Sequence, residues 1–203
     1  MSGSEWSPMT APEVADAALI ESSWHDPTAF AALYDRHAAT IHRYVARRLG
    51  ATAADDLVAE TFLAAFRHRK RYDRARADAL PWLYGIAANL IGKHRRAEVR
   101  LLRAFARTGH DPAVAGPAER VEDRVAAGAL HRELAAALAR LSSGDRDVLL
   151  LVAWADLTYE EVAAALRIPV GTVRSRLNRA RRTTRAVLGP DPSLAVPREE
   201  LTP

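Results

Sequence analysis

Residues 158–185, TYEEVAAALRIPVGTVRSRLNRARRTTR, form the pattern that most restricts the fold of this chain. Thr158 and Glu161 have the S/T-x-x-E spacing of a capping box, which marks the start of a helix. The helical pattern breaks at residues 167–170, where Pro169 lacks an amide hydrogen and suits a turn or the first position of a new helix. The stretch therefore predicts a helix, a tight turn and a second helix.

The second of these helices is apolar on one side and basic on the other. Its apolar positions follow a helical period and predict a core-facing stripe made of Val170, Val173, Leu177 and Ala180. Its outward positions include Arg174, Asn178, Arg181 and Arg185. No acidic residue occurs between Glu161 and Asp191. Forked guanidinium donors on a helix suit phosphates and guanine edges in a DNA major groove. The alternative is a solvated basic helix without a partner, but the capped helix and turn before it favour DNA binding.

Composition narrows the class of protein. The chain has 203 residues, a formal net charge of +4 at pH 7 and no cysteine, which excludes disulfides and thiolate metal sites. It has neither an apolar run of roughly 20 residues nor the apolar core of a signal peptide. We therefore expect no membrane insertion and a cytoplasmic location. Alternating strand patterns are scarce, so the expected fold class is all-α.

Glycine and proline positions predict two helical blocks. Residues 108–117 hold two glycines and two prolines, which indicates a linker. The expected organisation is a disordered tail at 1–13, a first domain at 14–98, a flexible linker at 99–126, a second domain at 127–188 and a carboxyl-terminal tail at 189–203.

The first block begins with an amphipathic helix that ends near Gly50. Its apolar face is traced by Phe30, Leu33, Tyr34, His37, Ile41, Tyr44, Val45 and Arg48. The next helix carries acids in its first turns, which is favourable to the helix dipole. Its buried side is expected to contain Val58, Phe62 and Phe66.

A cationic stretch at 67–76 follows, and Pro81 then begins a third helix that ends in a basic cluster. Cations interleaved with Tyr72, Trp82 and Tyr84 are what a surface for single-stranded nucleic acid needs, because phosphates require charge and unstacked bases require flat rings. The alternatives are that Trp82 belongs to the core and that Tyr72 anchors the loop.

Other chemistry has little support. Asp56 and Glu60 are four residues apart and could be paired carboxylates or metal ligands, but no histidine follows at ligand spacing. The sequence has no phosphate loop, no dinucleotide fingerprint and no nucleophile elbow. We expect no enzyme activity, no catalytic residue, no metal and no cofactor. The remaining rival is a helix-turn-helix regulator whose first block binds a ligand or dimerises.

The chain resembles sigma factors of the sigma-70 family, in the extracytoplasmic-function (ECF) group. Region 2 is similar to FAALYDRHAATIHRYVARRLG, AADDLVAETFLAAF and PWLYGIAANLIGKHRR, and region 4 is similar to LSSGDRDVLLLVAWADLTYEEVAAALRIPVGTVRSRLNRARR. The resemblance covers roughly residues 14–98 and 127–188. It implies an all-α protein of two small helical domains, which binds core RNA polymerase and promoter DNA and directs transcription initiation.

The resemblance also implies a role for individual positions. Contact with the β′ clamp helices of core polymerase falls on Asp55, Asp56, Leu57, Glu60 and Phe62. Melting and capture of the −10 element fall on Arg67, Arg71, Tyr72, Arg74, Trp82, Asn89, Lys93, Arg95 and Arg96. Reading of the −35 element falls on Thr172, Arg174, Ser175, Arg176, Asn178, Arg179 and Arg182. Region 4 would also rest on the β flap, and an anti-sigma factor is an implied partner.

Overall fold

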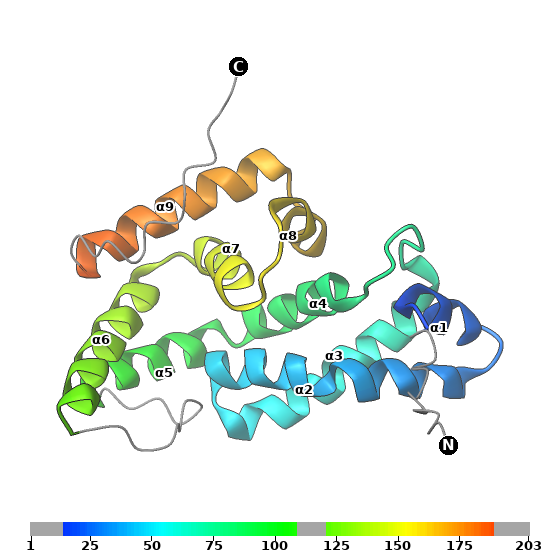
Figure 1. Ribbon diagram of the computed structural model, residues 1–203, viewed down its shortest axis with the longest axis horizontal. Helices are drawn as coiled ribbons and strands as arrows, with labels where there is room; N and C mark the ends of the chain where they lie inside the picture. Colours follow the sequence, from blue (N-terminus) through cyan, green and yellow to red (C-terminus); the bar gives the residue numbers. More distant parts are fainter. Residues whose placement is uncertain (1–13, 109–120, 189–203) are drawn as a thin grey trace, which may run out of the picture.

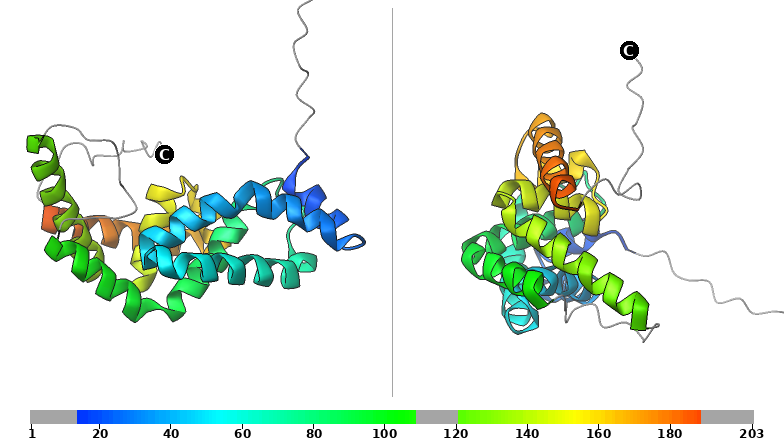
Figure 2. Two further views of the ribbon diagram at one scale, coloured as in Figure 1. Left: turned by 90° about the horizontal axis from the view of Figure 1, so that it is seen from below. Right: turned by 90° about the vertical axis from the view of Figure 1, so that its left-hand side faces the viewer.

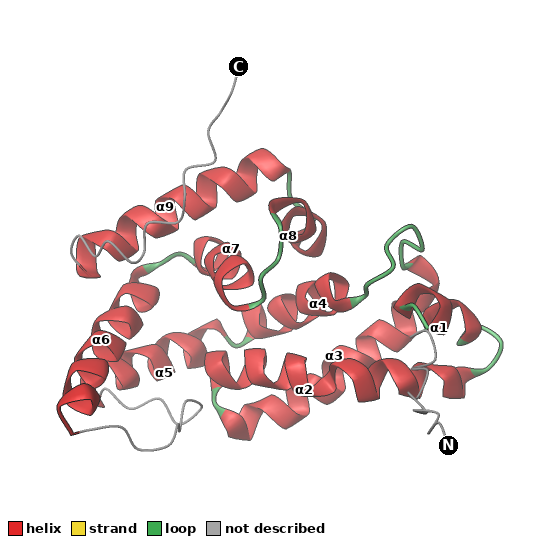
Figure 3. Cartoon of the chain, viewed as in Figure 1, coloured by secondary structure: helices red, strands yellow, loops and turns green. Residues whose placement is uncertain are grey.

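The computed structural model describes residues 14–108 and 121–188, with side chains described from residue 128 in the second range. Figure 3 shows these residues as helices and loops, and the described ranges contain no strand. The expected all-α class is therefore confirmed. The expected tails at 1–13 and 189–203, and the middle of the expected linker, lie outside the described residues.

The described residues of the first half, 14–108, form five α-helices and two short 3-10 turns (Figure 1). They are α1 (Asp16–Ser22), η1 (Pro27–Ala29), α2 (Phe30–Leu49), α3 (Ala51–His68), η2 (Arg69–Arg71), α4 (Leu80–Lys93) and α5 (Arg95–Thr108). Residues 121–188 form four further helices, which are α6 (Val121–Arg140), α7 (Ser143–Trp154), α8 (Tyr159–Leu166) and α9 (Val170–Leu188).

Helices α2 and α3 form an antiparallel hairpin at the base of the molecule (Figures 1 and 2). Gly50 joins them with a φ of 88°, a left-handed conformation that glycine adopts without a steric penalty. The predicted apolar face of α2 is confirmed for Leu33, Ile41 and Val45, which are fully buried. Tyr34 departs from it, because 46% of its surface is exposed.

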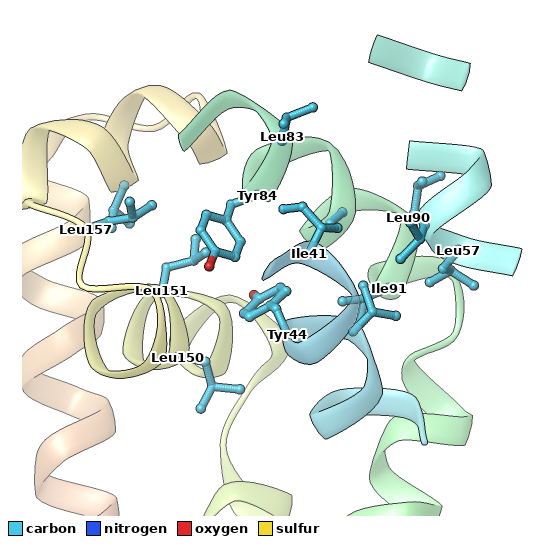
Figure 4. Close-up of a cluster of buried hydrophobic side chains, with 14 of the residues drawn as sticks. Ile41, Tyr44, Leu57, Leu83, Tyr84, Leu90, Ile91, Leu150, Leu151 and Leu157 are labelled. Carbon is cyan, nitrogen blue, oxygen red and sulfur yellow. The ribbon is translucent and has the colours of Figure 1, made fainter. Parts of the chain in front are cut away.

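Helix α4 lies on this hairpin and carries the second half of the chain on its other side (Figure 1). Pro81 occupies its first turn, where a missing amide hydrogen leaves no helical bond unmade. Figure 4 shows Tyr84 of α4 facing Tyr44 of α2, with Leu151 and Leu157 close by. The rings of Tyr44 and Tyr84 meet edge to face with centroids 5.0 Å apart. The two halves of the chain thus share one apolar core.

The expected linker at 99–126 requires a correction. Helix α5 continues through Thr108 and α6 begins at Val121, so residues 99–108 and 121–126 are helical. The physical reason in α5 is its amphipathic pattern, which buries Glu98 and Leu102 while α5 packs along α6. Where the two domains divide stays a prediction.

None of the helices in the described ranges is both long and apolar enough to cross a membrane.

Candidate nucleic-acid interface

The helix-turn-helix predicted at 158–185 is present in α8 and α9. Thr158 caps α8 with both bonds of a capping box, because its amide donates to Glu161 Oε2 at 2.8 Å and its Oγ1 accepts from the Glu161 amide at 3.3 Å. Arg167 ends α8 in a left-handed conformation with a φ of 54°. Val173, Leu177 and Ala180 are buried, so the predicted core-facing stripe of α9 is confirmed there.

The opposite face of α9 is open. The residues exposed on it are Arg174, Ser175, Asn178, Arg179 and Arg182, while Thr172 and Arg176 are half-buried. The Ser175 hydroxyl donates to the Thr172 carbonyl at 3.1 Å, which orients it along the helix. The exposed set is a continuous row of donors on a regular helix, which is the form that enters a major groove.

Arg179 of this face is bonded to the start of α7, and Arg176 lies close to it. Arg179 donates through Nη2 and Nε to the two oxygens of Asp145, at 2.9 and 3.3 Å. Burial acts to raise the pKa of Asp145, but hydrogen bonds from Arg179 and Ser142 outweigh it and leave the pKa below its usual value. Arg176 lies over Gly144, where an added Cβ would stand 2.8 Å from Nη1. Sequence reasoning missed Asp145, which is 34 residues from Arg179.

Tyr72 lies in the core of the loop before α4. Only 6% of its surface is exposed, and its hydroxyl lies 2.7 and 2.9 Å from the carbonyl oxygens of Arg76 and Asp78, which share its one donor hydrogen. Its ring packs on Trp82 with centroids 5.1 Å apart, and burial raises its pKa. The structure therefore favours the loop anchor over the stacking platform. Trp82 is half-buried and packs against the core.

The other predicted −10 residues lie on the surface at two places. Arg67, Arg71 and Arg74 surround the anchored loop, and Arg74 pairs with Glu21 and lies over the Trp24 ring at 5.1 Å. Exposed residues along the end of α4 and the start of α5 are Asn89, Lys93, Arg95 and Arg96. Lys93 Nζ is 3.4 Å from Glu60 Oε1 on α3.

A basic cleft of about 620 Å³ continues from this second place. It runs between α5 and the junction of α6 with α7. Its arginines are Arg95, Arg96, Arg100, Arg103 and Arg146. Arg146 is buried, and the other four are exposed.

The residues of α3 that were predicted to contact polymerase divide into two groups. Asp55, Asp56 and Glu60 are exposed, as a contact face requires. Leu57 and Phe62 are 4% and 5% exposed and therefore serve the core of the protein. Apolar surface is instead offered by Tyr34 and Leu63, which are 46% and 48% exposed. Sequence reasoning missed both, although Leu63 departs from the apolar period of α3.

Near α1, two carboxylates and a histidine form a cluster with the composition of a metal site, but hydrogen bonds within the protein already use it. Ligand atoms of Asp16, His37 and Asp78 lie within 4.8 Å of one another. The carboxylate of Asp16 already accepts from Arg36, from His37 Nε2 at 2.7 Å and from the Ala79 amide at 2.8 Å. These bonds tie α1, α2 and the loop before α4 together.

Buried charges connect the two halves of the chain. Glu98 on α5 accepts from Arg48 on α2 through Oε1, at 2.7 Å from Nε, and from Arg146 on α7 through Oε2, at 2.7 Å from Nη1. Arg48 Nη2 also lies 2.7 Å from Asp147 Oδ1. The side chains of Arg48, Glu98 and Arg146 are each 1–2% exposed.

Groups around this network have shifted pKa values. Burial raises the pKa of the Asp147 carboxyl despite the nearby Arg48. Burial likewise raises the pKa of Tyr44, whose hydroxyl accepts from Arg48 Nη1 at 2.8 Å, to about 12.

Known proteins match this chain over most of its length. The family model described as Sigma-70 region 2 matches residues 33–108, and the one described as Sigma-70, region 4 matches residues 131–183. The ECF RNA polymerase sigma factor SigL of Mycobacterium tuberculosis is 35% identical over 158 residues, which are 77% of this chain and 87% of SigL. SigK of Mycobacterium bovis is 31% identical over 183 residues, which cover 85% of this chain and 92% of SigK.

Solved structures share the fold of this chain. The structure of CnrH in complex with the cytosolic domain of CnrY has a TM-score of 0.58 and 26% identity, over 85% of this chain and 96% of that one. The sigma factor RpoE in complex with the anti-sigma factor NepR from Bartonella quintana has a TM-score of 0.56 and 21% identity, over 80% of this chain and 98% of that one, and so supports the fold. Together, the two matched regions and the relatives show that the chain belongs to the ECF group of sigma-70 family RNA polymerase sigma factors.

Proposed function

We propose that this sigma factor reads the −35 element with α9 and melts the −10 element with the loop before α4 and the surface around α4. The observation that carries the proposal is the open row of donors on α9, on a helix whose other side is buried. Membership of the ECF group implies binding to RNA polymerase and promoter-directed initiation. The division of labour between the two halves is the part that is proposed.

The residues proposed to read the −35 element differ in solvent exposure. Arg174 and Asn178 are exposed, and they suit guanine and adenine edges because each can make a bidentate pair. Thr172 and Arg176 sit nearer the protein and suit backbone phosphates. Arg179 reaches DNA in the orientation that Asp145 sets, so its role combines contact and positioning.

On the −10 side, cations surround a loop whose shape is fixed from inside. Tyr72 supports this loop through its hydroxyl, whose hydrogen two loop carbonyls share, while Arg67 and Arg71 face solvent and can bind phosphates. Asn89 and Lys93 on α4 present a donor row to the same strand. Removing a base from the stack costs a few kcal/mol, which contacts on such a surface must recover.

Polymerase binding is assigned to the exposed side of α3. Asp55, Asp56 and Glu60 supply charge, and Leu57 and Phe62 hold the helix in place from beneath. The exposed apolar surface of Tyr34 and Leu63 adjoins them, since the Tyr34 ring contacts Phe62 with centroids 4.8 Å apart. The second half of the chain would bind the β flap of the polymerase.

An anti-sigma factor is a proposed partner. RpoE was solved in complex with an anti-sigma factor, and its fold is shared by this chain. Because the sequence has no cysteine, thiol-based sensing would have to lie in the partner. We also propose that the protein acts in the cytoplasm, where core polymerase is found.

Run-off transcription with core polymerase and a promoter library tests the proposal. We expect a single class of promoter with paired −10 and −35 elements. A chain that neither co-purifies with core polymerase nor supports run-off from any promoter would be a helix-turn-helix regulator, the rival reading.

A further inference from the structure

The basic cleft between α5 and the junction of α6 with α7 is lined by charges of one sign. Its charged residues are all arginines, and no acid of the described residues lines it. The arginines are Arg95, Arg96, Arg100, Arg103 and Arg146. A concave site with charges of one sign concentrates its electric field and attracts ions of the opposite sign. The cleft therefore suits an anion.

The exposed arginines of the cleft form a row along one side of α5. Arg96 and Arg100 are four residues apart, and Arg100 and Arg103 are three apart, so these like charges are neighbours on the helix and repel one another. Glu98 is the one acid of α5, but both of its carboxylate oxygens are bonded within the buried charge network. No acid in the described ranges forms an ion pair with this row. An anion in the cleft would relieve the repulsion.

The start of α7 supplies the facing wall of the cleft. Ser143 is the first residue of α7 and lines the cleft. Amides in the first turn of a helix have no acceptor within the helix, and the helix dipole makes this end positive. Asp145, the acid of this turn, is bonded to Arg179 of α9 and does not line the cleft. The end of α7 thus adds to the attraction that the arginines exert on an anion.

Apolar side chains complete the lining, and Arg146 fixes its shape. Val99 and Ala139 are half-buried, and Leu141 is buried. The guanidinium of Arg146 donates to the Leu138 and Leu141 carbonyls at 2.9 and 3.0 Å, so it supports the end of α6. The volume of about 620 Å³ lies within the range of about 300–1,000 Å³ that is typical of small-molecule sites.

We propose that this cleft binds a small oligophosphate of the nucleoside triphosphate class, with its phosphates on the arginines of α5 and its ring against the apolar lining. Guanidinium groups bind phosphate oxygens in pairs and also stack on flat rings. The row from Arg95 to Arg103 extends on the order of 12 Å along the helix, so linked phosphates contact more of it than one phosphate does. A concave site favours a molecule small enough to enter it, whereas the convex face of α9 suits duplex DNA.

Isothermal titration calorimetry of the full chain tests the choice of ligand. The probes are ATP and AMP, titrated without divalent cations, which would otherwise compete for the phosphates. We expect ATP to bind at one site per chain and AMP to bind at least about tenfold more weakly, because AMP loses charge-assisted hydrogen bonds. Absence of ATP binding, or equal affinity for the two nucleotides, would overturn the proposal.

Paired substitutions test the position of the site. Arg100→Ala with Arg103→Ala removes two cleft arginines that lie outside the proposed −10 surface. Arg107→Ala with Arg185→Ala removes two exposed arginines that do not line the cleft, so the change in net charge is the same. We expect the first pair to weaken ATP binding at least about tenfold and the control pair to bind as the parent does. Equal losses would show attraction by net charge alone and would overturn the site.

Duplex promoter DNA is titrated into the same proteins, with helicity checked by circular dichroism. If the pair at Arg100 and Arg103 lost affinity for DNA but not for ATP, the cleft would be a DNA contact and the proposal would be wrong. Because ATP binding is measured without polymerase or promoter, its outcome is independent of the proposed −10 and −35 roles.

Discussion

Arg179 on α9 donates to both carboxylate oxygens of Asp145 on α7, at 2.9 and 3.3 Å. The pair fixes one cation of the basic face of α9 against the start of α7. It also means that the ionisation of Asp145 contributes to folding, because its pKa lies below the usual value.

Asp145→Asn should lower the urea midpoint of unfolding at pH 7. A carboxyl whose folded pKa is lowered stabilises the fold above its unfolded pKa of about 3.9, and this contribution is lost as the pH falls through the folded pKa. The difference between parent and variant should therefore shrink below about pH 4. An equal difference at pH 7 and at pH 3 would show that ionisation of Asp145 plays no part.

Arg176→Ala should weaken binding to duplex DNA of every sequence. If Arg176 neutralises one phosphate, its loss should flatten the slope of log K against log salt by about 0.9. Arg174→Ala is the matched comparison, and it should instead relax preference at one or two −35 positions by about 1–3 kcal/mol. A changed sequence preference with an unchanged slope would make Arg176 a base reader.

Tyr72→Phe separates anchoring from stacking. The variant keeps the ring that packs on Trp82 but loses the hydroxyl hydrogen that the two loop carbonyls share. We expect a loss of about 1 kcal/mol in the free energy of unfolding and weaker permanganate reactivity of the promoter bubble, with an unaltered −35 footprint. Tyr159→Phe, at a half-buried tyrosine of α8 without a hydroxyl bond among the described residues, is the control. Normal promoter melting by Tyr72→Phe would contradict the anchoring role and favour stacking of the Tyr72 ring on an unpaired base.

Local patterns predicted the parts of the fold whose contacts lie within one or two helical turns. Thr158 and Glu161 are three residues apart, and the stripe of α9 repeats at helical spacing, so both could be read directly. The cap of α7 is equally local, because the Ser142 Oγ accepts from the Asp145 amide at 3.2 Å. In each case the sequence interval itself defines the geometry.

Contacts between distant residues could not be predicted in this way. Arg48 and Glu98 are 50 residues apart, and Glu98 and Arg146 are 48 apart. The sequence indicated these contacts only through Arg48, a charged residue within the apolar face of α2. Such a position requires a buried partner, but the pattern does not say which acid supplies it. The same limit applies to Gly85, whose close neighbour belongs to another helix far along the chain.

Arg48→Met should be strongly destabilising. The substitution keeps much of the side-chain volume but leaves Glu98 and Asp147 with fewer cationic partners in a buried site. Breaking a buried ion pair on one side costs about 3–5 kcal/mol in the free energy of unfolding, measured by urea denaturation. Arg43→Met, on the exposed side of α2 with a bond to Thr40, should change it by less than about 0.5 kcal/mol. Similar losses in the two variants would contradict the buried network.

Asp56→Lys tests the proposed polymerase contact on α3. Asp56 is exposed, and a charge reversal there should weaken binding to core polymerase without loss of helicity or of −35 duplex binding. Glu60→Lys would not separate the two roles, because Glu60 also pairs with Lys93 near the proposed −10 surface. Glu133→Lys reverses another exposed charge, on α6, and serves as the control. Affinity for core polymerase is measured by fluorescence anisotropy of the labelled sigma factor. If Asp56→Lys and Glu133→Lys both bind as the parent does, the acidic face of α3 is not the polymerase contact. The exposed apolar side chains of Tyr34 and Leu63 are then the surface to test, because they lie on the same hairpin and carry no charge.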